Sequence, residues 1–215
     1  MQEPVEVNGI VIKSEPIGEY DRRVVILTKE RGKITAFAKG ARKPNSRFVA
    51  STNAFSYGVF RLYEGRNSYT LNDALISNYF EELRSDITTA YYGMYFLEVA
   101  DYYTRENNDE LDVLKLVYMS LRALSNVHLN SRLIRAVFEV KIVMINGEFP
   151  FDADKGEYTQ DIAKTLDYIY RTVPEKLYTF VLSEEVLNEL IKIAESVMRR
   201  TVGKKFTSLQ MLEVL

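Results

Sequence analysis

The chain has 215 residues, of which 47% are hydrophobic and 27% are charged, and its formal net charge is −2. This composition is ordinary for a globular protein and argues against extensive disorder. Because there is no cysteine and only one histidine, His128, the chain can form no disulfide, iron–sulfur cluster, thiolate zinc site or multi-histidine metal site. No stretch approaches the roughly 18 apolar residues of a membrane span, and the first residues are polar, so we expect a soluble, cytoplasmic protein.

The first 80 residues are predicted to form β-structure. Their β-branched and alternating segments predict five short strands, at residues 5–14, 23–28, 33–39, 54–63 and 68–77. The third strand alternates at period two, and its more polar face holds Lys33, Thr35, Phe37 and Lys39. A longer, basic connection over residues 40–51 follows it. This pattern predicts a small barrel of the OB type, with an SH3-like barrel as the alternative.

After residue 80 the hydrophobic spacing changes to a helical period. Helices are predicted from Ile87, with Ser85 or Asp86 as N-cap, and over residues 111–124, 132–145, 159–171, 183–200 and 207–214. The helix at 132–145 is apolar on nearly all sides, which places it centrally in a bundle. We therefore predict an α+β protein, with a five-stranded OB-type barrel at residues 1–80 and an α-helical domain at residues 81–215.

The sequence offers few catalytic groups. Gly32-Lys33 and Gly203-Lys204 both lack the glycine five positions earlier that a phosphate-binding loop needs. The neighbouring carboxylates Glu19 and Asp21 are interpreted as caps of a turn and not as an acid–base pair, and His128 is assigned no role. We therefore predict that the chain is not an enzyme and needs no cofactor.

An acidic segment at residues 152–157 resembles a calcium-binding loop only in part. Its sixth position, which should be glycine, is Glu157, and its twelfth, which should be a bidentate glutamate, is Ala163. The segment is therefore interpreted as an acidic turn, and no metal site is predicted.

Charge is distributed unevenly along the chain. Residues 1–80 hold 12 Lys and Arg against 8 Asp and Glu, whereas residues 81–215 hold 16 against 22, which together account for all 28 basic and 30 acidic residues. Between Arg22 and Arg66, 11 residues are basic and only Glu30 and Glu64 are acidic. Such asymmetry predicts an anion-binding end on an otherwise acidic body, although surface cations can also be solvated without a partner.

The predicted barrel carries this charge where OB folds bind nucleic acid, across the second and third strands and their framing loops. Lysine and arginine side chains along such a groove bind phosphates and release condensed counterions. Phe37, which faces outward between Lys33 and Lys39, either stacks on a base or packs against the helical domain. The predicted DNA-binding residues are Arg22, Arg23, Lys33, Phe37, Lys39, Arg42, Lys43, Arg47 and Arg66.

Arg132 and Arg135 lie on one stripe of the predicted helix at residues 132–145. One interpretation is an i,i+4 pair between Arg135 and Glu139, which is worth only about 0.2–0.5 kcal/mol. The other interpretation is a clasp that binds an anionic peptide of a partner protein.

Several segments resemble the bacterial RecO recombination-repair family. They include Gly18-Glu-Tyr-Asp21-Arg22, Lys39-Gly-Ala-Arg42-Lys43-Pro44 and Leu62-Tyr-Glu-Gly65-Arg66-Asn67, together with residues 9–13 and 27–34. The similarity is closely spaced across residues 9–83, weakens in the helical half and returns at residues 203–209, so that it covers the whole chain.

The resemblance implies an N-terminal OB-fold, a C-terminal helical domain and a recombination mediator that binds single- and double-stranded DNA and anneals complementary strands. It also implies that the protein, with its partner RecR, helps RecA to displace the single-strand-binding protein SSB, whose acidic C-terminal tail docks in the helical domain. Such a mediator acts in the cytoplasm, at the nucleoid. The alternative function is a non-enzymatic adaptor whose basic barrel binds an acidic protein partner.

In one respect the chain departs from many RecO proteins, which carry a four-cysteine zinc site shortly after the central helix. The corresponding residues 146–157 contain neither cysteine nor histidine, so we expect the helical domain to lack zinc. Packing of Phe149, Phe151 and Tyr158 is expected to hold this loop instead.

Overall fold

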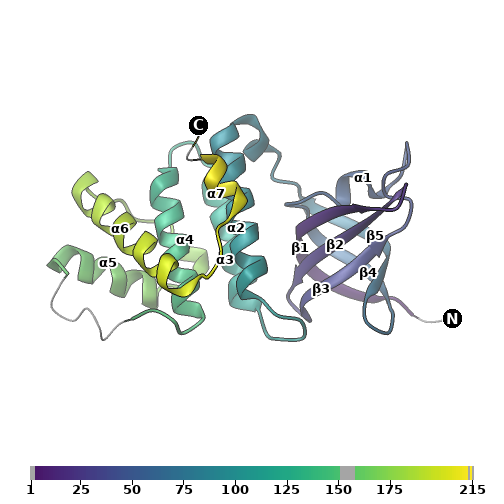
Figure 1. Cartoon of the computed structure of the whole chain (residues 1–215), viewed down its shortest axis with the longest axis horizontal. Helices are drawn as coiled ribbons and strands as arrows, with labels where there is room; N and C mark the ends of the chain where they lie inside the picture. Colours follow the sequence, from purple (N-terminus) through teal and green to yellow (C-terminus); the bar gives the residue numbers. More distant parts are fainter. Residues whose placement is uncertain (1–2, 151–157, 213, 215) are drawn as a thin grey trace. The chain divides into compact units, whose positions relative to one another are not determined.

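The computed structural model describes residues 3–150, 158–212 and 214, and Figure 1 shows its elements in chain order. The strands are β1 (Val5–Ile17), β2 (Asp21–Thr28), β3 (Gly32–Ala38), β4 (Tyr57–Glu64) and β5 (Tyr69–Asn78). The helices are α1 (Phe48–Ser51), α2 (Ile87–Tyr103), α3 (Leu111–Leu124), α4 (Ser131–Ile145), α5 (Gln160–Arg171), α6 (Glu184–Thr201) and α7 (Thr207–Leu212), with short 3-10 turns at Glu81–Ser85 and Pro174–Lys176. Two compact units result, one of Met1–Ser85 with Leu97–Leu114 and one of Asp86–Phe96 with Lys115–Leu215.

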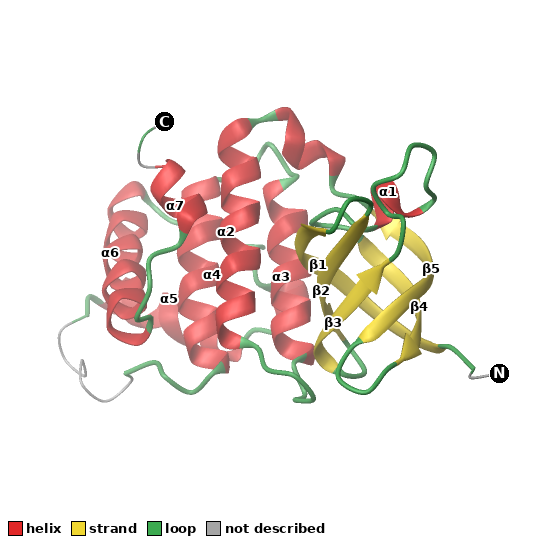
Figure 2. Cartoon of the chain, turned by 45° about the vertical axis from the view of Figure 1, so that its right-hand side comes forward, coloured by secondary structure: helices red, strands yellow, loops and turns green. Residues whose placement is uncertain are grey.

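The five strands close into a barrel in the order β1-β2-β3-β5-β4 (Figure 2). All neighbours pair antiparallel except β3 and β5, which run parallel and pair only at Ala36 with Tyr69 and at Phe37 with Thr70. The α+β fold class, with an OB-type barrel followed by helices, is therefore confirmed.

The barrel interior is built by the period-two alternation of its strands. Val24 and Ile26 of β2 and Ile34 and Ala36 of β3 point inward and are 0–3% exposed, next to Phe60 of β4. Each fully buried aliphatic or aromatic side chain contributes about 1.5–3 kcal/mol relative to an exposed one. The polar face of β3 consequently points outward, as the alternation predicts.

The strand ends differ from the predicted ones around the first turn. β1 continues through Pro16 to Ile17, and β2 begins at Asp21, so that Pro16 pairs with Arg22. Proline is tolerated there because it lies at the exposed end of the strand, where its missing backbone N–H does not interrupt the hydrogen bonds between the strands. The turn shortens to residues 18–20.

The connection from β3 to β4 contains α1, which periodicity does not predict because a four-residue helix is little more than one turn. Phe48 of α1 packs against the barrel core. This contact fixes the far end of the basic connection against the barrel, and α1 also packs on β5.

In the second unit α4 is the most deeply buried helix, as its apolar sequence predicts. Ten of its 15 residues are buried, and the ring of Phe138 stacks on Phe96 of α2 with centroids 4.1 Å apart. α4 packs against both α5 and α6. Asn130 caps its N-terminus by accepting a hydrogen bond from the backbone N–H of Arg132.

Gly32 joins the barrel to residues 105–108 within the first unit. It forms an isolated β-bridge with Glu106, and the next backbone N–H, of Lys33, donates to Arg105 O at 3.3 Å. Gly32 has a positive φ of 60°, and a Cβ atom there would lie 2.3 Å from the carbonyl oxygen of Asn108. Only glycine fits both requirements.

We predict that Gly32→Ala lowers the free energy of unfolding by about 3 kcal/mol, because strain and steric overlap add. Gly18→Ala is the matched control, since Gly18 also has a positive φ, of 55°, but no atom within 4 Å of the added Cβ. It should cost only about 1 kcal/mol. Urea denaturation measures both variants, and equal losses would contradict the role given to the contact with Asn108.

Candidate functional site

Six of the predicted DNA-binding cations lie at one end of the barrel. Arg42, Lys43 and Arg47 are exposed on residues 40–47, which we call the basic loop and which connects β3 to α1. β2 begins where β3 ends, because Arg22 pairs with Ala38. The cations at this end are Arg22, Arg23, Lys39, Arg42, Lys43 and Arg47.

The basic loop is fastened to the turn between β1 and β2. Arg42 donates its backbone N–H to Tyr20 O at 2.8 Å and its guanidinium to Glu19 O at 3.2 Å. Gly40 donates its N–H to the Asp21 carboxylate at 2.7 Å, which agrees with the interpretation of Asp21 as a turn cap. The loop cations are therefore carried on an ordered backbone.

Arg22 is used mainly inside the protein. Its guanidinium donates to Thr52 Oγ1 at 2.9 Å, to Asn53 Oδ1 at 2.7 Å and to Val49 O at 3.2 Å. Burial lowers the pKa of Arg22, and the nearby charge of Arg42 lowers it further. These bonds attach α1 and the residues after it to the start of β2.

Arg23, Phe37 and Arg47 keep solvent-facing area. Arg23 lies opposite Phe37 on the outer face of β2 and β3 and is 3.3 Å from the Glu15 carboxylate. The ring of Phe37 is half-buried. Arg47 donates to Asn72 O, and its guanidinium lies 4.8 Å from the ring centroid of Phe48.

Lys33 and Arg66 lie apart from the basic loop, beside the start of β3. The Lys33 amine donates to Asp101 Oδ1 at 3.0 Å and to Asp101 O at 2.7 Å, so its charge is already neutralised. Arg66 is exposed on the hairpin between β4 and β5, and both cations line a hollow of about 360 Å³ that also includes Glu106. The structure thus divides the nine predicted residues into two groups.

In the second unit, Arg132 and Arg135 both bind side chains of α6. Arg132 donates to Glu184 at 2.9 Å and to Asn188 at 2.5 Å. Arg135 donates to Glu139 at 2.9 Å and to Glu195 at 3.4 Å. The i,i+4 pair of Arg135 and Glu139, one of the two interpretations from the sequence, is present.

Glu139 is the buried centre of this network. It is 2% exposed and also accepts a hydrogen bond from the Tyr95 hydroxyl at 2.7 Å. Burial raises the pKa of Glu139, while Arg135 and Tyr95 oppose the shift. Removing Arg135 would leave an uncompensated carboxylate in the interior, which is strongly destabilising.

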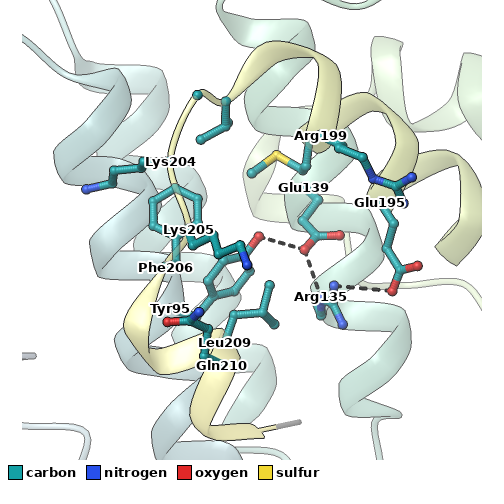
Figure 3. Close-up of a pocket in the computed structure, with 13 residues that line it drawn as sticks. Tyr95, Arg135, Glu139, Glu195, Arg199, Lys204, Lys205, Phe206, Leu209 and Gln210 are labelled. Carbon is teal, nitrogen blue, oxygen red and sulfur yellow. Dashed lines mark hydrogen bonds and ion pairs between the residues drawn. The ribbon is translucent and has the colours of Figure 1, made fainter.

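Above this network lies a pocket of about 550 Å³, formed by α2, α4, α6, α7 and residues 202–206 (Figure 3). The residues of the polar network, from Tyr95 through Glu139 and Arg135 to Glu195, are part of its lining, and dashed lines in Figure 3 mark their interactions. Its cations are Arg135, Arg199, Lys204 and Lys205, and its apolar lining includes Met198, Val202, Phe206 and Leu209. A ligand that has carboxylates and an apolar end matches the cations and the apolar side chains of this lining.

The cations of this pocket from α6 and from the segment before α7 were not predicted as site residues from the sequence. The available signal was the pair Lys204-Lys205 next to Phe206, shortly after α6, whose last turn carries Arg199 and Arg200. Tyr20, an exposed aromatic residue in the first turn, was also missed.

Part of the predicted loop after α4 lies outside the described residues, namely Phe151 and the acidic segment 152–157. Of its flanking aromatic residues, Phe149 is buried. In the described part of the chain, no three His, Asp or Glu side chains are grouped so that they could hold a metal ion. None of the helices described there is long and apolar enough to cross a membrane.

Comparison with known proteins matches both parts of the chain to one family. Residues 1–80 match the family model described as "Recombination protein O N terminal", and residues 84–151 match "Recombination protein O C terminal". A DNA repair protein RecO of Acetivibrio thermocellus is 30% identical, over 98% of this chain and 97% of its own length. The chain belongs to the RecO family.

Other RecO proteins are similar to this chain over different lengths. The protein of Clostridium novyi is 26% identical over 98% of this chain, and that of Alkaliphilus metalliredigens is 33% identical over 68% of it. The similarity to RecO that the sequence motifs suggest is therefore confirmed, and the chain is a DNA repair protein of that family.

The contacts of Arg22 in this RecO-family barrel predict a structural effect that Arg23 does not share. We expect Arg22→Ala to lower the free energy of unfolding by about 2 kcal/mol, because it removes charge-assisted hydrogen bonds from partly buried acceptors. Arg23→Ala removes one exposed ion pair and should cost less than about 1 kcal/mol. Urea denaturation of both variants tests this, and equal stabilities would show that Arg22 does not attach α1.

Proposed function

We propose that this RecO-family protein binds single- and double-stranded DNA at the barrel end that carries the basic loop, and that it anneals complementary strands there. The observation that carries the proposal is the convergence of Lys39, Arg42, Lys43 and Arg47, all exposed, at one end of the barrel. Phosphates that bind these cations release condensed counterions, and strands neutralised in this way can approach one another and pair.

Arg23 and Phe37 extend this surface along the outer face of β2 and β3. Beyond Arg23 the outer face of β2 is covered, because Val25 is 6% and Leu27 0% exposed. Lys33 and Arg66, the second group of predicted residues, therefore lie outside this continuous surface. With RecR, a protein that holds DNA in this way helps RecA to displace SSB in the cytoplasm, at the nucleoid. Phosphate binding and strand pairing need no catalytic group, and the proposed mediator is not an enzyme.

We predict that reversing the charge of Arg42, Lys43 and Arg47 together weakens oligonucleotide binding and makes its salt dependence shallower. Each lost phosphate contact removes about 0.7 from the slope of log K against log salt for single strands, so the slope should fall by about 2. Fluorescence anisotropy of a labelled strand, titrated at several salt concentrations, measures both quantities.

The matched control reverses three exposed lysines of the second unit, Lys164, Lys176 and Lys192. It changes the net charge equally and should leave the slope unchanged. An unaltered slope in the basic-loop variant would contradict the proposal. Equal affinity of the wild-type chain for DNA and for polyglutamate would favour the adaptor instead, because an adaptor for acidic proteins need not prefer phosphates.

We propose as a second function that the pocket of the second unit binds the acidic C-terminal tail of SSB. The cations Arg199 and Lys205 are exposed at its rim, and Phe206 and Leu209 supply apolar contact beside them. Arg135 belongs to the same pocket, whereas Arg132 lies on a neighbouring network with Glu184. An acidic peptide with an apolar end matches both kinds of lining.

We predict that a fluorescent peptide with several aspartates and an apolar C-terminal residue binds the full chain, and that Lys205→Glu weakens binding at least tenfold. Arg132→Ala should weaken it less, because Arg132 is outside the pocket lining. Anisotropy titrations at fixed salt measure each variant. A scrambled peptide of the same charge controls for the apolar end, and unchanged binding to Lys205→Glu would exclude this pocket.

A further inference from the structure

The turn between β1 and β2 presents an exposed aromatic ring beside the basic loop. Tyr20 is 43% exposed, and the amine of Lys43 lies 5.5 Å from the centroid of its ring. Large aromatic side chains are usually placed where most of their area is buried. An aromatic ring and a lysine amine therefore lie together on a surface that solvent reaches.

Hydrogen bonds hold the turn that carries this ring in a defined place relative to the basic loop. The carbonyl of Tyr20 accepts the backbone N–H of Arg42 at 2.8 Å, and the Arg42 guanidinium donates to the carbonyls of Glu19 and Gly18. At the next residue along the chain, Asp21, the carboxylate accepts the backbone N–H of Gly40. A ligand that binds here need not first order the two segments.

The pairing of ring and cation matches the chemistry of a nucleotide. An unpaired base offers a flat π-face that stacks on an aromatic ring, and the phosphate next to it binds a lysine or arginine. In a duplex the bases are already stacked on one another, so that their faces are not available without unstacking. A protein that uses a ring in this way prefers single strands.

We propose that Tyr20 stacks on an unpaired base and gives the basic loop a preference for single-stranded over double-stranded DNA. The inference rests on the proposed DNA binding at this end of the barrel and assigns a separate role to one side chain. Phe37, the aromatic residue singled out from the sequence, is half-buried on β3, whereas Tyr20 is exposed. The basic loop supplies affinity for any phosphate chain, and the ring distinguishes strands with free bases.

Two substitutions at position 20 separate stacking from charge. Tyr20→Ala should weaken binding of a labelled single strand by about 5-fold to 150-fold, the range that loss of one base–aromatic stack produces. Its duplex affinity should change less than twofold, and its salt slope should stay the same because no phosphate contact is lost. Tyr20→Phe keeps the ring and should bind like the wild type, as should Tyr170→Ala, which removes an exposed tyrosine from α5.

A direct spectroscopic readout is available because the chain contains no tryptophan. Tyr20→Trp introduces a single indole, and its emission should be quenched when an unlabelled single strand saturates the protein but not when the duplex does. A purely structural role of the turn would not produce this difference.

The outcomes distinguish this inference from the function on which it rests. If the wild-type chain binds neither strand, DNA binding at this end of the barrel is wrong. If the wild type binds but Tyr20→Ala retains its single-strand affinity, or the indole emission does not respond, the stacking role is wrong. Equal losses for single strand and duplex would also overturn it, because they would show that Tyr20 only positions the loop.

Discussion

Closure of the barrel depends on the parallel pairing of β3 with β5, which involves only Ala36 with Tyr69 and Phe37 with Thr70. The first half of β3 therefore has no partner in β5, and its start instead bridges to residues 105–106, through Gly32. Its last residues emerge beside the start of β2 and lead directly into the basic loop. The short closing contact thus determines where the loop leaves the barrel, and the hydrogen bonds of Arg42 then hold it on the first turn.

The same closure determines which cations remain available to a ligand. Arg23 of β2 and Lys33 of β3 lie on the outer face, whereas Arg22 is in phase with the inward-facing Val24 and Ile26 and pairs with the buried Ala38. Two of these cations acquire partners within the chain. Lys33 is neutralised by Asp101, and Arg22 is used to attach α1. Arg42 binds backbone carbonyls and Lys43 lies against the Tyr20 ring, contacts that do not neutralise their charge. Arg47 also binds a backbone carbonyl, but its guanidinium lies 3.7 Å from the Asp73 carboxylate, which compensates part of its charge. The exposed cations Lys39, Arg42 and Lys43 therefore lie together at one end of the barrel.

Local periodicity was sufficient to predict the five strands, the barrel class and nearly all helices. A strand or helix that buries one face carries apolar residues at a regular spacing, and this spacing can be recognised in the sequence. The partners of charged side chains could not be predicted in this way. Arg22 bonds residues 27 to 31 positions away, and Lys33 bonds a residue 68 positions away. Lys141 is 7% exposed in α4, where its amine binds the carbonyls of Ile169, Tyr170 and Thr172 at the end of α5. These hydrogen bonds depend on tertiary packing, and the residues next to each cation in the sequence do not predict its partner.

The acidic composition of residues 81–215 does not prevent an anion site in the second unit, because screening limits the reach of surface charges to about 8 Å at physiological salt. The pocket lining includes the exposed cations Arg199 and Lys205, while its carboxylates, the buried Glu139 and the partly exposed Glu195, are bound to Arg135. Arg199, however, also stabilises the negative end of the α6 helix dipole, and part of its charge is compensated there. Apolar contact with Phe206 and Leu209 must then supply the rest of the affinity, which is why an acidic segment without an apolar end should bind this pocket weakly.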